Sequence, residues 1–503
     1  MEPNEIIGNA DTIAAISTPQ GSGGIAVIRI SGPKSLEITN KAWKGTDLLK
    51  AKGHTTHFGV YISTSGNELD EALATVFRTP ASFTGEDTVE LSIHGSKWIQ
   101  REVLNDLISR GARMANPGEF TQRAFLNGKI DLTQAEGVAD LISSSSKAAH
   151  DLALRQTRGS FSKEFENLRG KLIEIASLLE LELDFSEEDV EFADRSVLKS
   201  LCDEILQKVE NLANSYSRGA VLKEGVPVVI AGIPNAGKSS LLNLLLNDEK
   251  AIVTDIPGTT RDIIEDTLEL DGILFRFIDT AGLRDTSDAV EEIGVERARK
   301  ALEKAFIVIW VIDSTASIEP QLEELEKFHK NNPDIKIITL FNKSDIGEKT
   351  YLDITSRQDT NSEEESRFNI NSKEASKLPS DSDETLSLDT NSMGASLNRL
   401  NPIPFSSKTF QGLLQLISEL KKHAYGNNNP QTDLIVTNAR HYESLTRAAE
   451  SLRRVRKGLI EMIPSDFVAI DLREALHHLG TITGAITTDT LLTSIFSSFC
   501  IGK

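Results

Sequence analysis

Hydrophobic positions change their spacing several times along the 503-residue chain, and the first change marks the end of an N-terminal region. Between residues 11 and 96, short runs rich in β-branched residues alternate with turn residues, which is typical of strands. Residues 98–109 then show the spacing of an amphipathic helix. We therefore predict an α+β domain over residues 1–127.

A helical spacing begins near residue 131 and returns after residue 423. Over residues 161–179, apolar side chains recur alternately four and three positions apart, which places them on one face of a long helix. Neither helical region has another element against which to bury such a face, so the two regions are expected to pack together. We predict one discontinuous helical domain formed by residues 128–224 and 424–503.

Between the two helical regions, strands and helices alternate as in an α/β domain, and we predict such a domain over residues 225–423. Residues 351–400 break its pattern, because they contain ten serines, ten acidic residues and five basic residues without an apolar period. Such a segment cannot bury enough apolar surface to fold. We therefore predict a disordered insertion at about 351–400.

The composition limits the expected cellular location of the protein and the classes of partner that it can bind. A formal net charge of −21 argues against nucleic-acid binding by the whole surface, although a local basic patch stays compatible with it. No apolar run approaches the roughly 18 residues that a membrane-spanning helix needs. The two cysteines, Cys202 and Cys500, cannot build a disulfide framework, and the first ten residues contain acids but no arginine. These features predict a cytoplasmic protein without a membrane partner.

One motif lies at the start of the central domain, between a valine-rich run at 226–231 and a leucine-rich run at 241–246. Its residues 232–239 follow the pattern G-x-x-x-x-G-K-S of a phosphate-binding loop. Glycines let backbone N–H groups turn toward phosphate oxygens at the N-terminus of the following helix. Lys238 would contact the β- and γ-phosphates, and Ser239 would ligate Mg²⁺. The residues expected to bind the nucleotide here are Asn235, Ala236, Gly237, Lys238, Ser239 and Ser240.

Two further motifs suit the γ-phosphate side of a nucleoside triphosphate. The first motif is a threonine-rich loop, in which one threonine can complete the coordination shell of Mg²⁺. The second motif offers an aspartate that can bind Mg²⁺ through a water and a glycine whose amide can face the γ-phosphate. The loop contains Thr254, Asp255, Ile256, Pro257, Gly258, Thr259 and Thr260. The second motif consists of Asp279, Thr280, Ala281 and Gly282. Their order along the chain is that of a P-loop nucleotide hydrolase.

The base-binding residues come next. Asn342, Lys343 and Asp345 follow a buried strand. The carboxylate of Asp345 can accept hydrogen bonds from N1–H and from the 2-amino group of guanine, which adenine does not offer. The loop that would close over the base contains Ser406, Ser407 and Lys408. Because these motifs occur in order, each beside a strand end, the sequence predicts a GTPase.

The residue after Gly282 poses a chemical problem. Many GTPases carry there a glutamine that orients the attacking water, but this chain has Leu283, whose side chain cannot do so. Another group must therefore position the water. The loop 284–294 offers carboxylates, and the sequence shows no evident arginine finger. The residues alone leave open whether one of these carboxylates is catalytic or all of them are solvated loop acids.

Sequence signatures outside the nucleotide motifs are more specific for one protein family than the GTPase motifs, which many families share. They are Asp11-Thr-Ile, Thr18-Pro, Gly23-Gly24, Arg29-Ile-Ser-Gly32, Phe83-Thr-Gly-Glu-Asp87, Glu90, the run from Arg123 to Glu136, and the terminus from Phe496 to Lys503. Through these and the nucleotide motifs, the chain outside residues 351–400 resembles the MnmE (TrmE) family of bacterial tRNA-modification GTPases. The resemblance implies an N-terminal α+β folate-binding and dimerisation domain, a discontinuous all-α helical domain and an inserted Ras-like P-loop G domain.

The resemblance also implies an activity and partners. The chain would be a potassium-activated GTPase that forms a homodimer and, with the FAD-dependent partner MnmG, a heterotetramer. Together they would install aminomethyl or carboxymethylaminomethyl groups at carbon 5 of the wobble uridine of certain tRNAs. The one-carbon unit would come from 5-formyl- or 5,10-methylene-tetrahydrofolate.

Individual roles follow from the same resemblance. The implied folate contacts are Arg29, Glu90, Lys129 and Lys503. The implied K⁺ ligands are Asn235, Thr254, Ile256 and Thr259, and the implied Mg²⁺ ligands are Ser239 and Thr260. Glu291 matches the catalytic glutamate of the family, and Lys238 matches its phosphate-loop lysine. The role of Cys500 stays open.

Two other classes of protein share part of this pattern. A ribosome-assembly GTPase would carry the central motifs, but with an RNA-binding appendage in place of the N-terminal and C-terminal signatures. A stand-alone folate-dependent methyltransferase would not need an intact nucleotide site. Folate binding and the nucleosides of tRNA distinguish all three classes.

Overall fold

The computed structural model describes residues 11–184, 195–247, 252–253, 265–278, 302, 304–346, 402–426, 434–500 and 502. The predicted insertion at 351–400 lies outside them. By their contacts, the described residues form two compact units. The first comprises residues of Met1–Ser143, Ala153–Ala213 and Arg440–Lys503, and the second comprises residues of Ser144–Leu152 and Asn214–Ala439.

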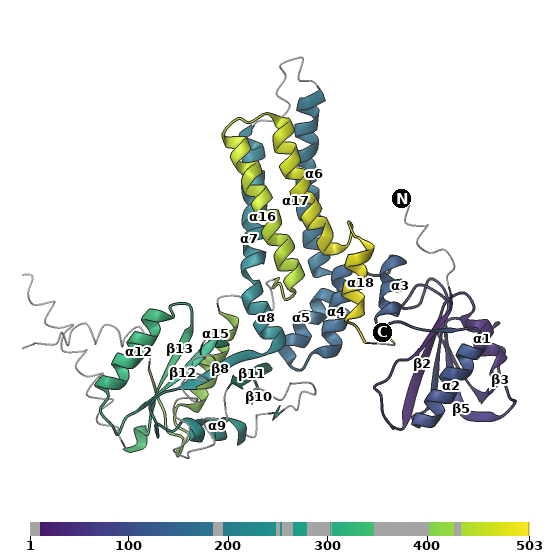
Figure 1. Ribbon diagram of the computed structural model, residues 1–503, viewed down its shortest axis with the longest axis horizontal. Helices are drawn as coiled ribbons and strands as arrows, with labels where there is room; N and C mark the ends of the chain where they lie inside the picture. Colours follow the sequence, from purple (N-terminus) through teal and green to yellow (C-terminus); the bar gives the residue numbers. More distant parts are fainter. Residues whose placement is uncertain are drawn as a thin grey trace, which may run out of the picture. The chain divides into compact units, whose positions relative to one another are not determined.

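The first unit begins with a seven-stranded sheet in the order β3-β4-β5-β6-β2-β1-β7 (Figure 1). Its strands are β1 (Ile13–Ile16), β2 (Ile25–Ser31), β3 (Trp43–Gly45), β4 (Thr55–Ile62), β5 (Glu68–Phe77), β6 (Thr88–His94) and β7 (Arg113–Met114). Neighbouring strands are antiparallel except β1 and β7, which are parallel. Helices α1 (Ser35–Lys41) and α2 (Lys97–Ser109) share one hydrophobic core with these strands. The predicted α+β domain and its helix over 98–109 are thereby confirmed.

The two faces of this sheet differ, because successive side chains of a strand point to opposite sides. On β5, Ala72 and Ala74 are buried in the core, whereas Leu73 between them is 43% exposed. Phe58 lies opposite Leu73 on β4 and is 65% exposed. One face of the sheet is therefore packed into the core with the helices, and the other keeps apolar side chains accessible.

The other helices of the first unit come from two stretches of the chain, residues 119–214 and 439–497 (Figure 1). They are α3 (Glu119–Leu126), α4 (Leu132–Ser143), α5 (Lys147–Thr157, which begins in the second unit), α6 (Ser160–Asp184), α7 (Arg195–Asn214), α16 (Ala439–Ile460), α17 (Ser465–Thr483) and α18 (Asp489–Ser497). Helix α6 packs against α17, and the Cys202 thiol of α7 donates to the Leu452 carbonyl of α16 over 3.7 Å. The predicted apolar face of α6 is buried: Phe161, Phe165, Leu168, Leu172, Ile175 and Leu179. The two helical regions thus pack together as predicted.

A buried group of charges also joins the two helical regions. Glu136 on α4 accepts hydrogen bonds from Arg440 Nε at 2.8 Å and Nη2 at 2.9 Å, and pairs with His441 Nε2 at 2.7 Å. Arg440 additionally donates to the carbonyls of Thr481 and Ile482 at the end of α17. Burial alone would raise the pKa of Glu136, but His441 and Arg440 hold that pKa at about 2. The carboxylate therefore stays ionised inside the protein.

The second unit is built on another seven-stranded sheet, in the order β14-β13-β12-β8-β11-β10-β9 (Figure 1). Its strands are β8 (Val226–Ala231), β9 (Ile252–Val253), β10 (Glu265–Leu270), β11 (Ile273–Ile278), β12 (Ile307–Asp313), β13 (Lys336–Asn342) and β14 (Ile403–Pro404). The strands from β14 to β11 run parallel, and the edge strands β10 and β9 are antiparallel. Its helices are α8 (Tyr216–Glu224), α9 (Lys238–Asn247), α12 (Glu319–Asn331) and α15 (Leu413–Tyr425).

Helices cover both faces of this parallel sheet, which explains why all seven residues of β12 are buried. Alternate β12 residues enter two hydrophobic clusters: Ile309 packs with residues of α9 and α15, and Trp310 packs with residues of α12. In such a sheet, ligands bind at the carboxyl ends of the strands. The structure thus has the predicted α/β domain inserted into a helical one. Within the described ranges, none of the helices is long and apolar enough to cross a lipid bilayer.

Candidate functional site

The predicted phosphate loop lies between the end of β8 and the start of α9 and follows a tightly constrained path. Gly232 and Gly237 have φ angles of +137° and +99°, which L side chains rarely adopt. A Cβ at Gly232 would lie 2.2 Å from the Val311 carbonyl oxygen, and one at Gly237 would lie 2.1 Å from Asn342 Nδ2. Only glycine therefore fits at these two positions of the pattern.

Lys238 is folded back over this loop. Its Nζ donates to the carbonyls of Gly232 and Ile233, both at 2.8 Å, and burial lowers its pKa. A phosphate would offer this ammonium anionic acceptors in place of two neutral carbonyls, which favours its charged form. Ser239 follows in the first turn of α9, at the positive end of the helix. The loop therefore has the geometry of an anion site.

The base-side motif is tied to this loop. β12 and β13 end side by side at Asp313 and Asn342. Asn342 Nδ2 donates to the Ala236 carbonyl in the phosphate loop at 2.7 Å, and Lys343 Nζ donates to Asp313 Oδ2 at 2.6 Å. Burial alone would raise the pKa of Asp313, but hydrogen bonds from Lys343 and Thr315 hold it below its ordinary value. These contacts fix the loop that carries the exposed Asp345.

The loop of residues 406–408 packs against residues 342–345. Ser344 Oγ donates to the Phe405 carbonyl at 2.9 Å, and the Ser407 N–H donates to Asn342 Oδ1 at 3.4 Å. The buried Ser406 accepts hydrogen bonds from the N–H groups of Lys408 and Thr409 at 3.3 and 3.2 Å. The phosphate loop, residues 342–345 and residues 406–408 therefore meet at one edge of the sheet, although they are far apart in sequence.

A second group of predicted residues lies on the accessible face of the N-terminal sheet. Arg29 on β2 and Glu90 on β6 are direct neighbours across the strands. Arg29 Nε and Nη2 lie 2.9 and 2.8 Å from Glu90 Oε1. The guanidinium carbon lies 5.4 Å from the centre of the Phe83 ring and 5.6 Å from that of Phe120, so two aromatic rings and a carboxylate orient it.

The loop 79–87 connects this pair to Lys129. Lys129 Nζ donates to the Pro80 carbonyl at 2.9 Å, and a Cβ at Gly85 would lie 3.2 Å from Lys129 Cγ. The same loop carries Phe83, which lies over Arg29. Arg29, Glu90 and Lys129 are therefore gathered around one loop.

The C-terminal tail reaches the same domain. Ser17 Oγ, next to β1, donates to the Gly502 carbonyl at 3.0 Å, and a Cβ at Gly502 would lie 2.3 Å from the Ile16 carbonyl oxygen. The exposed Cys500 accepts a hydrogen bond on its carbonyl from the N–H of Gly118 at 3.3 Å. Because β1 pairs with β2, Gly502 contacts the end of the strand next to the one that carries Arg29.

Comparison with known proteins decides the family. The family model for the MnmE helical domain matches residues 132–500, and that for the GTP-binding protein TrmE N-terminus matches residues 12–129. The tRNA modification GTPase MnmE of Bacteroides fragilis is 47% identical over 501 residues, which cover 98% of this chain and 100% of that protein. The protein of the same name from Cytophaga hutchinsonii is 45% identical over 504 residues, with complete coverage of both chains. This chain belongs to the MnmE family.

Membership in the MnmE family removes the support for the two alternative classes, because both terminal regions match MnmE (TrmE) families. Among solved structures, the G domain of the T. maritima FeoB iron transporter matches 40% of this chain and 98% of that chain at 24% identity, with a TM-score of 0.24. A likeness that weak carries no weight for fold or activity.

Several residues predicted from the nucleotide motifs or from the MnmE resemblance lie outside the described residues. They are Thr254, Asp255, Ile256, Pro257, Gly258, Thr259, Thr260, Asp279, Thr280, Ala281, Gly282, Glu291 and Lys503. Within the second unit the structure brings the phosphate loop together with the base-side loops, and within the first unit it brings together three of the four implied folate residues. The sequence did not single out Asp313 or Phe120, whose contacts with Lys343 and Arg29 arise only in the fold. Asp313 could have been found from the sequence, because it is the acidic residue that ends the buried strand β12.

Proposed function

We propose that this protein binds and hydrolyses GTP and acts in the modification of tRNA. The observation that carries the proposal is the hydrogen bond from Asn342 to the Ala236 carbonyl, which joins a phosphate loop to a guanine-type base loop. Lys238 would bind the β- and γ-phosphates, and Asp345 would accept the N1–H and 2-amino groups of guanine. The relatives named tRNA modification GTPase MnmE match essentially the whole chain, which supports the same activity here.

Two cations complete the proposal. Mg²⁺ would be held by Ser239 and Thr260, and the place of Ser239 in the first turn of α9 fits this role. K⁺ would be held by Asn235, Thr254, Ile256 and Thr259. Asn235 fits, because its φ of +62° belongs to the same tight turn that exposes backbone groups to the phosphates. Bound cations of this kind neutralise charge that develops on the transferring phosphoryl group.

Glu291 would position the attacking water, because Leu283 stands where many GTPases have a glutamine. Its carboxylate would hold the attacking water through a second water. Lys238 would stabilise negative charge on the γ-phosphate during the same step. The protein itself thus supplies the orientation of water and one positive charge.

We further propose that the N-terminal domain binds 5-formyl- or 5,10-methylene-tetrahydrofolate through Arg29, Glu90, Lys129 and Lys503. The residue types fit such a ligand: a cation such as Lys129 suits its glutamyl carboxylate, and Glu90, which pairs with Arg29, can accept hydrogen bonds from pterin N–H groups. Gly502 contacts the end of β1, which pairs with β2, and this supports a contact from Lys503. The folate would supply the one-carbon unit for the tRNA wobble uridine.

The proposed assembly is a homodimer through the N-terminal domains that works in the cytoplasm with an FAD-dependent MnmG-type protein. The accessible sheet face supports the homodimer, because exposed Phe58 and Leu73 are neighbours on it. Contiguous exposed apolar side chains of this kind mark interaction surfaces. A role for Cys500 in the uridine chemistry is compatible with its exposure and with its place in the tail.

The folate proposal has a direct test. Arg29→Ala and Glu90→Ala should each abolish measurable binding of 5-formyl-tetrahydrofolate in calorimetry, because each change removes a ligand contact and leaves its partner charge unpaired. GTP hydrolysis should persist, since the nucleotide loops belong to the other unit. Glu68→Ala is the matched control, because its pair with Lys44 is exposed and lies elsewhere in the same domain. Unchanged folate affinity in both variants would exclude the pair from the site.

A further inference from the structure

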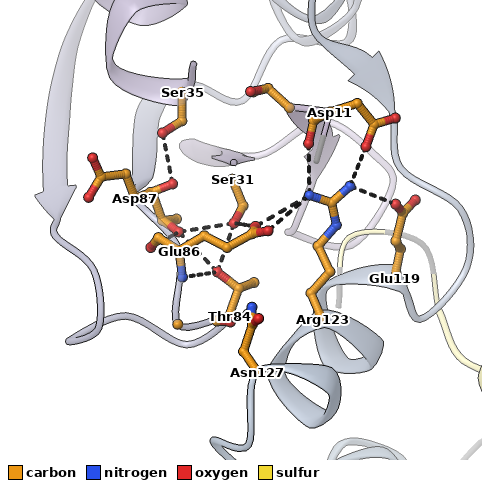
Figure 2. A network of polar contacts seen from close by, with 12 residues as sticks. Asp11, Ser31, Ser35, Thr84, Glu86, Asp87, Glu119, Arg123 and Asn127 are labelled. Atoms are coloured by element: carbon orange, nitrogen blue, oxygen red, sulfur yellow. Dashed lines mark hydrogen bonds and ion pairs between the residues drawn. The ribbon is translucent and has the colours of Figure 1, made fainter. Parts of the chain in front are cut away.

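A cluster of charges lies behind the loop 79–87, on residues without an assigned role in binding. Figure 2 shows Arg123 directed from α3 toward three carboxylates, those of Asp11, Glu86 and Glu119. Its Nη2 donates to Asp11 Oδ1 at 2.6 Å and to Glu119 Oε1 at 3.0 Å, and its Nη1 lies 3.2 Å from Glu86 Oε1. The Arg123 side chain is only 12% exposed. Such a multidentate, largely buried contact requires the planar fork of arginine.

The three carboxylates are not equivalent. Asp11 and Glu119 are each shared with a second guanidinium, that of Arg113, at 2.6 Å. Among the described residues, Glu86 has no cationic partner other than Arg123, and its other oxygen accepts a hydrogen bond from Ser31 at 2.7 Å. The loss of Arg123 would therefore leave Glu86 without charge compensation, whereas Asp11 and Glu119 would keep Arg113.

Glu86 belongs to the loop that gathers the proposed folate residues. The α3 segment holds this loop at three points: Arg123 at Glu86, Asn127 Nδ2 at the Thr84 carbonyl (2.7 Å), and Lys129 at the Pro80 carbonyl (Figure 2 shows the first two). Phe83 lies between these points, with its ring over Arg29. Phe83, whose ring lies over Arg29, is thus carried by a loop that contacts the α3 segment on both sides of it.

The start of the same helix contacts the C-terminal tail. Gly118, the N-cap of α3, donates to the Cys500 carbonyl at 3.3 Å, and a Cβ at Gly118 would lie 2.6 Å from the Phe496 carbonyl oxygen. Helix α3 therefore packs against the tail at its first turn and holds the loop 79–87 further along.

We infer that Arg123 is a positioning residue for the one-carbon site: by holding Glu86, it fixes the loop 79–87 so that Phe83 and Arg29 present a preformed surface to the folate. The inference rests on the proposed folate function. Arg123 acts through Glu86 and the loop. A preformed surface binds more tightly, because the ligand does not have to order the loop.

A double-mutant cycle on folate affinity tests this inference. Arg123→Met and Glu86→Gln should each weaken 5-formyl-tetrahydrofolate binding about tenfold in calorimetry. The double variant should bind no more weakly than either single variant, because the two changes break one contact. GTP hydrolysis should stay at the level of the unaltered protein. Arg113→Met is the matched control and should keep folate affinity within about threefold, because Arg113 does not contact Glu86.

The outcomes separate this inference from the proposed function. If the unaltered protein binds no folate, both fail. If it binds folate and the single variants bind equally well, only the positioning role fails. A double variant that loses about 100-fold, the product of two independent tenfold effects, would also overturn it. Arg123→Lys keeps the charge without the fork and should weaken binding as Arg123→Met does; full affinity in that variant would contradict the geometric argument.

Discussion

Replacement of potassium by sodium at constant ionic strength should slow GTP hydrolysis by this protein by up to about 10³-fold, or about 4 kcal/mol of activation free energy. The chain has Leu283 where a water-orienting glutamine is common and shows no evident arginine finger in its sequence. A cation beside the γ-phosphate would therefore carry the stabilisation that an arginine finger supplies elsewhere. Sodium is smaller, and a cage of oxygens sized for potassium does not hold it equally well.

The measurement is the steady-state rate of phosphate release in KCl and in NaCl. Equal rates in the two salts would show that potassium does not activate GTP hydrolysis. Glu291→Ala tests the water-positioning role in the same assay, because it should lower kcat while GTP affinity stays nearly unchanged. Glu292→Ala is the matched control. If that control loses activity and Glu291→Ala does not, the catalytic carboxylate is the neighbouring one.

Glu136→Gln should lower the free energy of unfolding by about 3 kcal/mol, measured by urea unfolding followed through helical circular dichroism. The change keeps the size of the side chain but removes the carboxylate that pairs with Arg440 and His441, whose side chains are 16% and 1% exposed. Glu443→Gln on the same helix as Arg440 is the matched control. Its pair with Arg447 is exposed on both sides, so the cost should stay below about 1 kcal/mol.

The pH dependence of this difference gives a second test. The pKa of Glu136 is about 2 in the folded protein, below its ordinary value of 4.5. A carboxylate whose pKa falls on folding adds stability above its unfolded pKa, and this contribution is lost as the pH drops toward the folded pKa. The stability gap between the unaltered protein and Glu136→Gln should therefore be full at about pH 6 and shrink between about pH 4.5 and 2. A gap that does not change over this range would contradict the ionised carboxylate.

Features set by local spacing were predictable from the sequence. The apolar positions predicted to form one face of α6, which are Phe161, Phe165, Leu168, Leu172, Ile175 and Leu179, are buried, because a helix repeats its face every three to four residues. The phosphate loop was also predictable, since Gly232 and Gly237 occupy backbone conformations that other residues rarely adopt. In both cases, the cause lies within a few neighbouring residues.

Contacts between distant segments were not predictable in this way. Glu136 and Arg440 are 304 positions apart, and nothing in the spacing of either segment indicates that they meet. Arg123 and Glu86 both occur in family signatures, yet their hydrogen bond depends on how α3 packs against the N-terminal sheet. Such polar pairs are fixed by tertiary packing, which a one-dimensional pattern does not contain.

We propose that the two units serve one reaction, the modification of the tRNA wobble uridine. The most direct test is nucleoside analysis by mass spectrometry of tRNA from cells that lack this chain and from the same cells that express it again. We predict that aminomethyl and carboxymethylaminomethyl groups at carbon 5 of uridine disappear with the chain and return with the unaltered protein, but not with Lys238→Ala or Arg29→Ala. Unchanged uridine nucleosides in cells that lack the chain would contradict the claim.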